Sequence, residues 1–218
     1  VNTLNYSNKR DLRAKDWPVA EELKGGGDKL LRNDGGKFTD VSEQAGIYGS
    51  LIGFGLGVTV GDVNGDLRPD IYVSNDFFER DYLYLNQKNG TFKESLTSMM
   101  NGISSASMGA DMADLNNDIY PEIFVTDMLP REFGRYQSKA TFEDWNKFQY
   151  NLKHDYFQQF TRNTLQWNNG NNTFSEIGQL SGVSNTDWSW GALFADFDND
   201  GWKDIYIGNG YKRDVTDL

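Results

Sequence analysis

One short acidic pattern occurs three times in this sequence and limits what the chain can fold into. The stretches read DVNGDLRPD from residue 62, DLNNDIYPE from residue 114 and DFDNDGWKD from residue 196. In each stretch, acidic or amide side chains occupy positions 1, 3, 5 and 9. Carboxylates held this close repel one another unless a cation lies between them. The spacing therefore predicts three oxygen-ligand loops for a hard metal ion, and calcium is the natural candidate.

The predicted ligands are the side chains at positions 1, 3, 5 and 9 of each loop, together with the backbone carbonyl at position 7. They are Asp62, Asn64, Asp66, Arg68 and Asp70 in the first loop, Asp114, Asn116, Asp118, Tyr120 and Glu122 in the second, and Asp196, Asp198, Asp200, Trp202 and Asp204 in the third. These loops are not EF-hands, because an EF-hand needs a bidentate Glu at position 12, where this chain has Val73, Val125 and Ile207. The alternative is an Asp/Asn turn that closes a hairpin without metal.

Position 6 distinguishes the third loop from the other two. Gly201 suits a left-handed backbone there, whereas Leu67 and Ile119 would adopt that conformation at a cost on the order of 1 to 2 kcal/mol. Either these two loops turn differently, through Gly65 and Asn117, or they bind metal more weakly. The third loop also has four carboxylates against three in each of the others. The expected order of calcium affinity is third, first, second.

The acidic loops belong to a repeat of roughly 50 residues, a period typical of repeat architectures. A glycine-containing apolar stretch precedes each loop, with Gly57, Gly109 and Gly191 at the same position, and a strand-like run such as DIYVSND follows it. A hairpin pattern lies upstream of each loop, at a nearly constant interval. In this pattern, Asn is followed by a turn and then by a strand that starts with Phe. Four antiparallel strands per unit predict an all-β fold of β-propeller blades.

These repeats divide the chain into an N-terminal segment at 1–28 and propeller blades at 29–218. The blades are a half blade at 29–48, a blade at 49–101, a blade at 102–184 and a half blade at 185–218. About three blade equivalents are fewer than closed propellers usually have, which indicates a fragment of a larger propeller. Open sheet edges favour pairing with another chain. We therefore expect self-association through the open blade edges.

One repeat carries an insertion at 128–162 with a different periodicity. Its apolar residues at helical spacing are Phe142, Trp145, Phe148, Leu152 and Tyr156. Thr141 and Asp144 resemble a capping box at its start. The pattern predicts a helix of about four turns over 141–157, within a helical insertion near 137–160 that packs on the propeller. It would act as a stabilising lid or, alternatively, as a recognition surface.

The acidic loop followed by a strand, in repeats with an upstream glycine-rich strand, resembles the FG-GAP or VCBS repeat of integrin α-subunit propellers and of many bacterial envelope proteins. The stretch LLRNDGGKFTDVSEQAGI is further similar to bacterial VCBS-repeat proteins related to cartilage acidic protein, which often end in an ASPIC/UnbV module not seen here. The resemblance covers nearly everything after residue 28. It implies that the loops bind calcium and that the propeller serves adhesion or partner recognition.

The composition excludes several other classes of function. The net charge of -11 and the pI near 4.5 argue against a nucleic-acid partner. The chain has no cysteine, and its one histidine, His154, lies in the insertion, so zinc clusters and a Ser-His-Asp triad are poorly supported. No apolar run is long enough to span a membrane, and the chain starts without a signal peptide. We expect no enzyme activity.

Two functions from different classes remain. The first is a calcium-binding propeller that acts as an adhesion or protein-interaction module outside the cytoplasm, at the cell surface, in the periplasm or in secreted form, with a structural metal and a protein or glycan ligand. The second is the carbohydrate-binding or scaffold part of a polysaccharide-processing protein. In that case exposed aromatic rings would stack on sugars, unless they pack between blades. The candidate rings are Phe77, Phe78, Trp188 and Trp190.

Overall fold

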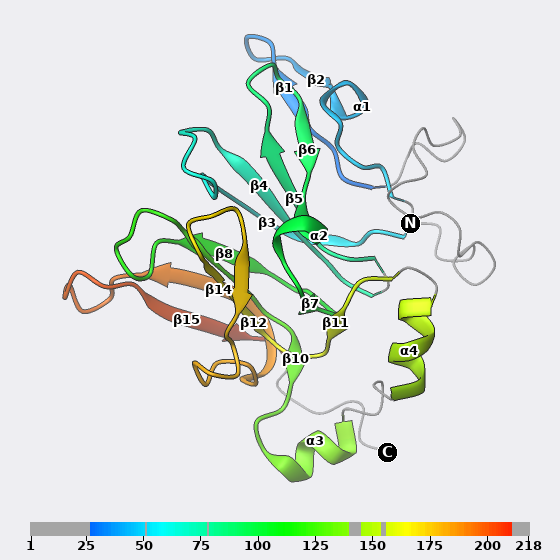
Figure 1. The fold of residues 1–218 in the computed structure, drawn as a ribbon, viewed down its shortest axis with the longest axis vertical. Coiled ribbons are helices and arrows are strands. Elements are labelled where there is room, and N and C mark those ends of the chain that lie inside the picture. Colours follow the sequence, from blue (N-terminus) through cyan, green and yellow to red (C-terminus); the bar gives the residue numbers. More distant parts are fainter. Residues whose placement is uncertain (1–26, 51, 78, 140–144, 154–155, 211–218) are drawn as a thin grey trace.

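Two four-stranded antiparallel sheets form the centre of the molecule (Figure 1). The computed structural model describes residues 27–50, 52–77, 79–139, 145–153 and 156–210. The first sheet has the order β3 (Gly55–Gly61), β4 (Asp70–Asn75), β5 (Tyr82–Asn86) and β6 (Phe92–Glu94). The second has the order β8 (Ala110–Ala113), β9 (Glu122–Val125), β12 (Thr164–Asn168) and β13 (Phe174–Glu176). The prediction of an all-β fold with blades of four antiparallel strands is confirmed.

Partial sheets flank these two blades. The hairpin of β1 (Leu31–Asn33) and β2 (Phe38–Asp40) precedes the first blade. The pair of β14 (Asp187–Ala195) and β15 (Asp204–Asn209) follows the second, and β10 (Met128–Leu129) adds to the other edge of β14. The sequence did not predict β10, nor the parallel pairing of β7 (Ile103–Ser104) with β11 (Gln159–Phe160). These short pairs connect the insertion to the blades.

Side chains that alternate along the strands fill three clusters between successive sheets. On β4, Tyr72 lies in the cluster shared with the second blade, whereas Val73 faces the β1–β2 hairpin. On β9, Ile123 faces the first blade and Phe124 packs near Phe194 of β14, with ring centroids 6.3 Å apart. Successive residues of a strand point to opposite faces of its sheet. The middle strands β4 and β9 therefore bury side chains on both faces of their sheets.

Two of the three glycines that precede the acidic loops allow the first strands of neighbouring sheets to approach closely. A Cβ added to Gly57 would lie 3.0 Å from the Cα of Gly109. A Cβ on Gly109 would lie 2.7 Å from the carbonyl oxygen of Trp190 and 3.4 Å from the Cα of Gly191. A side chain at Gly109 would therefore clash with the neighbouring backbone. The close approach explains the glycine at positions 57 and 109, whereas a Cβ on Gly191 would meet no described atom within 4 Å.

The helical insertion differs in detail from the prediction. It contains two helices, α3 (Phe133–Lys139) and α4 (Trp145–Lys153). Two one-turn helices, α1 (Ser42–Ala45) and α2 (Leu96–Met99), lie outside the insertion, between strands. The predicted helix over 141–157 is too long, because Tyr156 lies outside helical structure. Thr141, Asp144 and His154 lie outside the described residues. The sequence did not indicate α3, which contains Gly134 and has no regular apolar spacing.

Helix α4 packs on the sheets through one edge. Phe148 stacks on Phe160 of β11 with ring centroids 5.4 Å apart, whereas Trp145 is 70% exposed. No described residue of α4 is fully buried. Among the described residues, no helix is long and apolar enough to cross a membrane.

Candidate metal centres

Each acidic stretch forms the loop between the first and second strands of a sheet. The loops connect β3 to β4, β8 to β9, and β14 to β15, and they project to the left in Figure 1, away from α3 and α4. In each loop the strand pairing starts at the position-9 acid, for example between Gly61 and Asp70. The sequence therefore places the three loops at equivalent points of the blades.

The carboxylate at position 1 closes each loop by accepting two backbone N–H groups, those of positions 5 and 6. Asp196 accepts them at 3.0 and 3.0 Å. Asp62 does so at 3.1 and 2.7 Å, and Asp114 at 3.1 and 2.8 Å. The oxygen at position 3 accepts the position-5 N–H as well, at 3.0, 3.0 and 3.2 Å in the three loops. The side chains at positions 1 and 3 therefore point into the loop in all three repeats.

The backbone is the same in all three loops. Positions 4 and 6 both adopt positive φ, at Gly65 (74°) and Leu67 (63°), Asn117 (60°) and Ile119 (76°), and Asn199 (61°) and Gly201 (92°). The alternative that the first two loops turn differently is therefore wrong. The N–H of position 6 donates to the position-1 carboxylate in each loop, and this bond helps to hold Leu67 and Ile119 in a conformation that their side chains disfavour.

The acid at position 9 anchors the start of the second strand. Asp70 accepts the N–H of Val63 at 3.1 Å and that of Asn86 at 2.8 Å. Glu122 accepts the N–H of Leu115 at 2.8 Å. In the third loop, Asp204 accepts the N–H of position 2 at 3.0 Å but is exposed. The first two position-9 acids are completely buried.

Burial raises the pKa of Asp70 and of Glu122, and their backbone donors oppose this change. The buried Oε1 of Glu122 has no hydrogen-bond partner among the described residues. A buried acceptor without a partner costs on the order of 1 to 3 kcal/mol. A bound cation would remove this cost.

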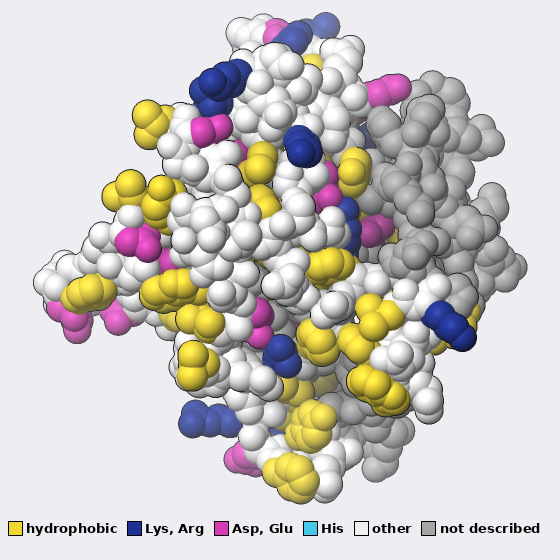
Figure 2. All heavy atoms as spheres, in the orientation of Figure 1, with side chains coloured by type: hydrophobic (Ala, Val, Ile, Leu, Met, Phe, Trp, Pro, Cys, Tyr) yellow, Lys and Arg dark blue, Asp and Glu magenta, His cyan; other side chains and the backbone are white. Residues whose placement is uncertain are grey.

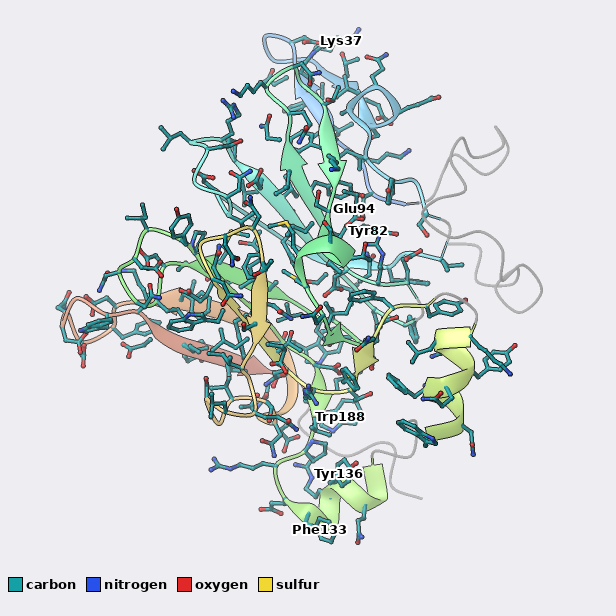
Figure 3. The ribbon with its side chains drawn as sticks, in the orientation of Figure 1. Lys37, Tyr82, Glu94, Phe133, Tyr136 and Trp188 are labelled. Atoms are coloured by element: carbon teal, nitrogen blue, oxygen red, sulfur yellow. The ribbon has the colours of Figure 1, made fainter. Side chains whose placement is uncertain are left out.

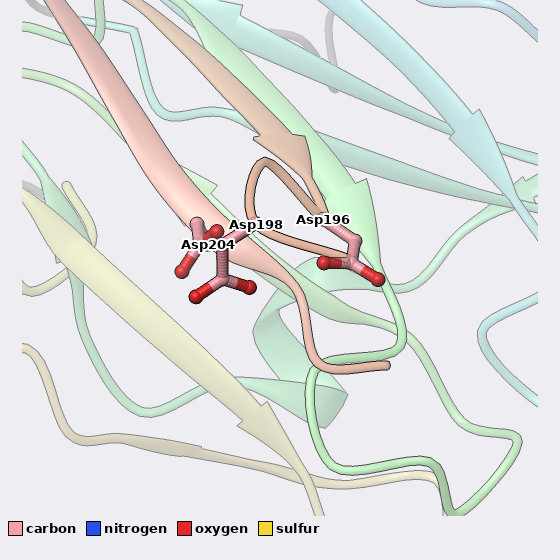
Figure 4. A group of neighbouring side chains, drawn as sticks. All are labelled: Asp196, Asp198 and Asp204. Atoms are coloured by element: carbon pink, nitrogen blue, oxygen red, sulfur yellow. The ribbon is translucent and has the colours of Figure 1, made fainter. Parts of the chain in front are cut away.

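The third loop brings its carboxylates closest together. Oxygen atoms of Asp196, Asp198 and Asp204 all lie within 4.8 Å of one another. Figure 4 shows these three side chains on the β14–β15 loop. These oxygens suit calcium, which prefers carboxylate, carbonyl and water ligands, better than a softer metal. In the described part of the chain, this is the one acidic group so closely spaced.

In the first and second loops, a neighbouring side chain donates a hydrogen bond to one of the carboxylates. Arg68 donates to Asp66 at 2.7 Å, and the Asn116 side-chain amide donates to Asp118 at 2.8 Å. The sequence pattern indicated Arg68 only as a carbonyl ligand and did not indicate this ion pair. The N–H at position 7 donates to the position-5 acid in each loop, at 3.1, 2.9 and 2.8 Å. The carbonyl ligands at Arg68, Tyr120 and Trp202 stay predictions.

The loops of neighbouring repeats contact each other. The side-chain amide of Asn117 donates to the carbonyl of Gly201 at 3.2 Å. The ring of Tyr120 lies 3.1 Å from where a Cβ on Gly65 would be. The second loop therefore touches both the first and the third, which allows a change in one loop to affect its neighbours.

The sequence of this chain matches the FG-GAP-like repeat at residues 19–73, 64–125 and 156–207. The chain belongs to the FG-GAP-like repeat family. This confirms the resemblance inferred from the acidic loops. Comparison with curated proteins gave no match. FG-GAP-like repeats suggest a β-propeller-like interaction module, and they are typical of extracellular proteins.

Two buried carboxylates at the opposite ends of the blades were missed by sequence analysis. Asp81 accepts the N–H of Asn75 at 2.7 Å and the hydroxyls of Tyr72 at 2.5 Å and Ser107 at 2.9 Å. Burial raises its pKa to about 7, and these donors oppose the increase. The negative charge of Asp127 raises it further.

The second blade contains the same junction with the two residue types exchanged. Where Asn75 donates its N–H to Asp81 in the first blade, Asp127 donates its N–H to Asn163 at 2.7 Å in the second. The Asp127 carboxylate accepts the Ser104 hydroxyl at 2.5 Å and several backbone N–H groups, and burial raises its pKa to about 6. Asn75 ends the stretch DIYVSN and Asp127 ends the equivalent stretch EIFVTD. This match in position could have indicated that the two junctions are equivalent.

Proposed function

We propose that this chain is a calcium-stabilised propeller module that takes part in recognition outside the cytoplasm. The observation that carries the proposal is the carboxylate group of Asp196, Asp198 and Asp204, whose oxygens lie within 4.8 Å of one another in a loop of the same geometry as the other two. Extracellular calcium modules bind with dissociation constants of about 10⁻⁴ to 10⁻³ M. Such sites fill where calcium is abundant.

The role proposed for the metal is structural. The position-1 acid follows the first strand and the position-9 acid begins the second, so a calcium ion between them would join the two strands and remove the repulsion among the carboxylates. The predicted ligands face one another and the loop backbone, with no adjoining general base or nucleophile in the described loops. We therefore propose no enzyme activity for these sites.

The affinities should follow the chemistry of each loop. The third loop has an additional carboxylate at position 3, and the described structure gives none of its acids a cationic partner. In the first loop Arg68 competes for Asp66, and in the second Asn116 bonds Asp118. These contacts support the third loop ahead of the other two, and the order of the first ahead of the second is kept from the sequence.

Calorimetric titration of calcium into chelator-stripped protein tests this proposal. The variants Asp66→Ala, Asp118→Ala and Asp200→Ala each remove the position-5 carboxylate of one loop. Asp34→Ala, an exposed acid of the β1–β2 turn, serves as the control. We expect the tightest site to be lost in Asp200→Ala and binding to be unchanged in Asp34→Ala. Absence of binding heat, or the greatest loss in Asp118→Ala, would contradict the proposal.

We also propose that copies of the chain associate through their open edges. The outer edge of β15 has no strand partner among the described residues. Exposed apolar side chains lie nearby, with Leu193 at 50% and Tyr206 at 62% exposure, and β3 exposes Val58 at 67%. Sedimentation should show a concentration-dependent dimer at micromolar protein. A monomer throughout that range would exclude it.

A further inference from the structure

A pocket of about 280 Å³ opens beside α4, on the side of the molecule away from the acidic loops. Three aromatic rings line it, Phe77 after β4, Phe148 of α4 and Trp188 of β14. Figure 2 shows hydrophobic side chains gathered over β10, β11 and α4, in this part of the surface. Two of the four rings predicted for sugar stacking, Phe77 and Trp188, therefore lie in one pocket. Trp190 lies outside it, beside Gly210, and Phe78 is outside the described residues.

Two strained backbone positions hold the rings at this pocket. Phe77 has a φ of 68°, and Asp187, which precedes Trp188 at the start of β14, has a φ of 79°. A non-glycine residue in this region costs on the order of 1 to 3 kcal/mol, and such residues cluster at binding sites. At both positions an Asp side chain accepts the N–H of the following aromatic residue, Asp76 from Phe77 at 2.7 Å and Asp187 from Trp188 at 2.9 Å. The same contact therefore fixes an aromatic residue after β4 and another at the start of β14.

Further contacts fix the same walls. Arg135 of α3 forms an ion pair with Asp187, which ties the start of β14 to the insertion. Phe148 stacks on Phe160 with ring centroids 5.4 Å apart. The hydroxyls of Ser105 and Thr161 are hydrogen-bonded at 2.8 Å and join the connection before β8 to the segment after β11. The pocket is therefore built from connections of three sheets, with its walls held before any ligand binds.

The polar groups of the lining favour a neutral, hydroxyl-rich ligand. Asn151, Gln159 and Thr161 can each donate and accept hydrogen bonds. The lining contains one cationic side chain, Lys147, and one acidic side chain, Asp76, so it has no excess of positive charge. The chain as a whole has a net charge of -11, which repels anions. Ligand pockets commonly combine apolar walls with a few such polar groups.

We propose that this pocket binds a neutral hexose-type sugar ring at the end of a glycan. The C–H groups on one face of a hexose would pack on Trp188 or Phe77, while its hydroxyls bond the amide and hydroxyl side chains. The inference names the ligand class for the recognition role proposed above and rests on that role. It also gives a location to the carbohydrate alternative predicted from the sequence.

The test is binding of wild-type protein to an array of neutral and acidic glycans, followed by titration with the best neutral oligosaccharide. Trp188→Ala and Phe77→Ala should each weaken binding at least tenfold, and Thr161→Val should weaken it several-fold. Phe38→Ala, which removes a ring that is 62% exposed on β2, should leave binding unchanged. Because a Trp188 variant could perturb the fold, Phe77→Ala and Thr161→Val provide two further readouts.

Three results would overturn the inference. The first is that the protein binds no neutral glycan, and the second is that it prefers acidic glycans. The third is that Phe77→Ala and Phe38→Ala bind the glycan with the same affinity. Calcium titration of the same preparations keeps the two proposals distinguishable. If calcium binds and no glycan does, the pocket inference fails alone, and if glycans bind without calcium heat, the calcium proposal fails alone.

Discussion

The two ends of each blade use acidic side chains in opposite ways. At one end, the acidic loops crowd carboxylates against one another, and oxygens of Asp196, Asp198 and Asp204 lie within 4.8 Å. At the other end, Asp81 is buried at the junction in the first blade and Asp127 at the junction in the second. Each accepts hydrogen bonds from hydroxyl and backbone N–H groups. A carboxylate can thus be stabilised by protein donors where it is isolated, whereas a crowded group needs a cation.

The comparison predicts its largest effect at the buried end. Asp127→Ala would leave the Ser104 hydroxyl and the N–H groups of Ser105 and Ala106 without their acceptor. Buried donors without partners are costly, so we expect a loss of about 3 to 5 kcal/mol in the free energy of unfolding. Urea denaturation in the presence of a chelator measures it.

The matched control is Asp200→Ala in the same calcium-free buffer. Asp200 is exposed, so its loss should change the free energy of unfolding by less than about 0.5 kcal/mol without metal. Equal destabilisation by the two variants would break the comparison between the two ends.

The dependence of stability on pH should come mainly from the buried end. The pKa of Asp81 is raised to about 7 and that of Asp127 to about 6, above the usual value of 3.8. The folded state therefore keeps protons that the unfolded state has released, and stability without calcium should fall as pH rises from 5 to 8, by about 1.4 kcal/mol per unit of pKa shift that is titrated.

Thermal melts across this pH range in chelator and in calcium provide the measurement. Asp127→Asn, which cannot titrate, should remove its part of the slope in both buffers and leave the calcium-dependent increase in Tm unchanged. An unchanged slope in Asp127→Asn, or a wild-type stability that rises with pH in chelator, would contradict the assignment of buried, protonated acids to one end.

Relief of backbone strain in the second loop should give an effect of about 1 kcal/mol. Ile119 has a φ of 76° and is 78% exposed, so Ile119→Gly removes strain and sacrifices little burial. The free energy of unfolding should increase by up to about 1 kcal/mol. Gly201→Ala in the third loop, where φ is 92°, should decrease it by a similar amount. Destabilisation by Ile119→Gly, or stabilisation by Gly201→Ala, would mean that position 6 does not need a left-handed backbone.

The smallest expected effect concerns Arg68. Its guanidinium donates to Asp66 at 2.7 Å, so Arg68→Ala should free this carboxylate and tighten the first calcium site a few-fold. Lys37→Ala makes the same change in net charge at the far end of the β1–β2 hairpin (Figure 3) and should leave that site unaffected. Calorimetric titration of both variants compares them. A similar increase in calcium affinity in both variants would mean that the effect comes from net charge and not from the Arg68–Asp66 ion pair.

The repeated spacing of the acids, glycines and hairpins predicted the blades because each feature is local and recurs with the same physical requirement. Gly109 illustrates this, since the close approach of neighbouring strands demands a glycine. The left-handed Leu67 and Ile119 could not be foreseen from residue preference, because the position-1 carboxylate that holds each N–H lies five residues away.

The parts that the sequence did not predict depend on contacts between distant segments. Asp127 meets Asn163 across the insertion, and Ser107 of one connection donates to Asp81 of another. The short parallel pair of β7 with β11 and the addition of β10 to β14 likewise join segments far apart in sequence. Local patterns contain no signal for such pairs, and α3 lacks the apolar periodicity that helix prediction requires.

The central claim is that calcium in the acidic loops stabilises the blades, and thermal melts of wild-type protein at pH 7.5 in excess calcium and in chelator test it most directly. We expect a higher Tm in calcium than in chelator. The increase in Tm should grow with calcium concentration, because calcium binds the folded state. A variant with Asp66→Ala, Asp118→Ala and Asp200→Ala combined should lose that increase while its Tm in chelator stays near the wild-type value. Identical wild-type melts in calcium and in chelator would contradict the claim and identify the loops as turns that hold no metal.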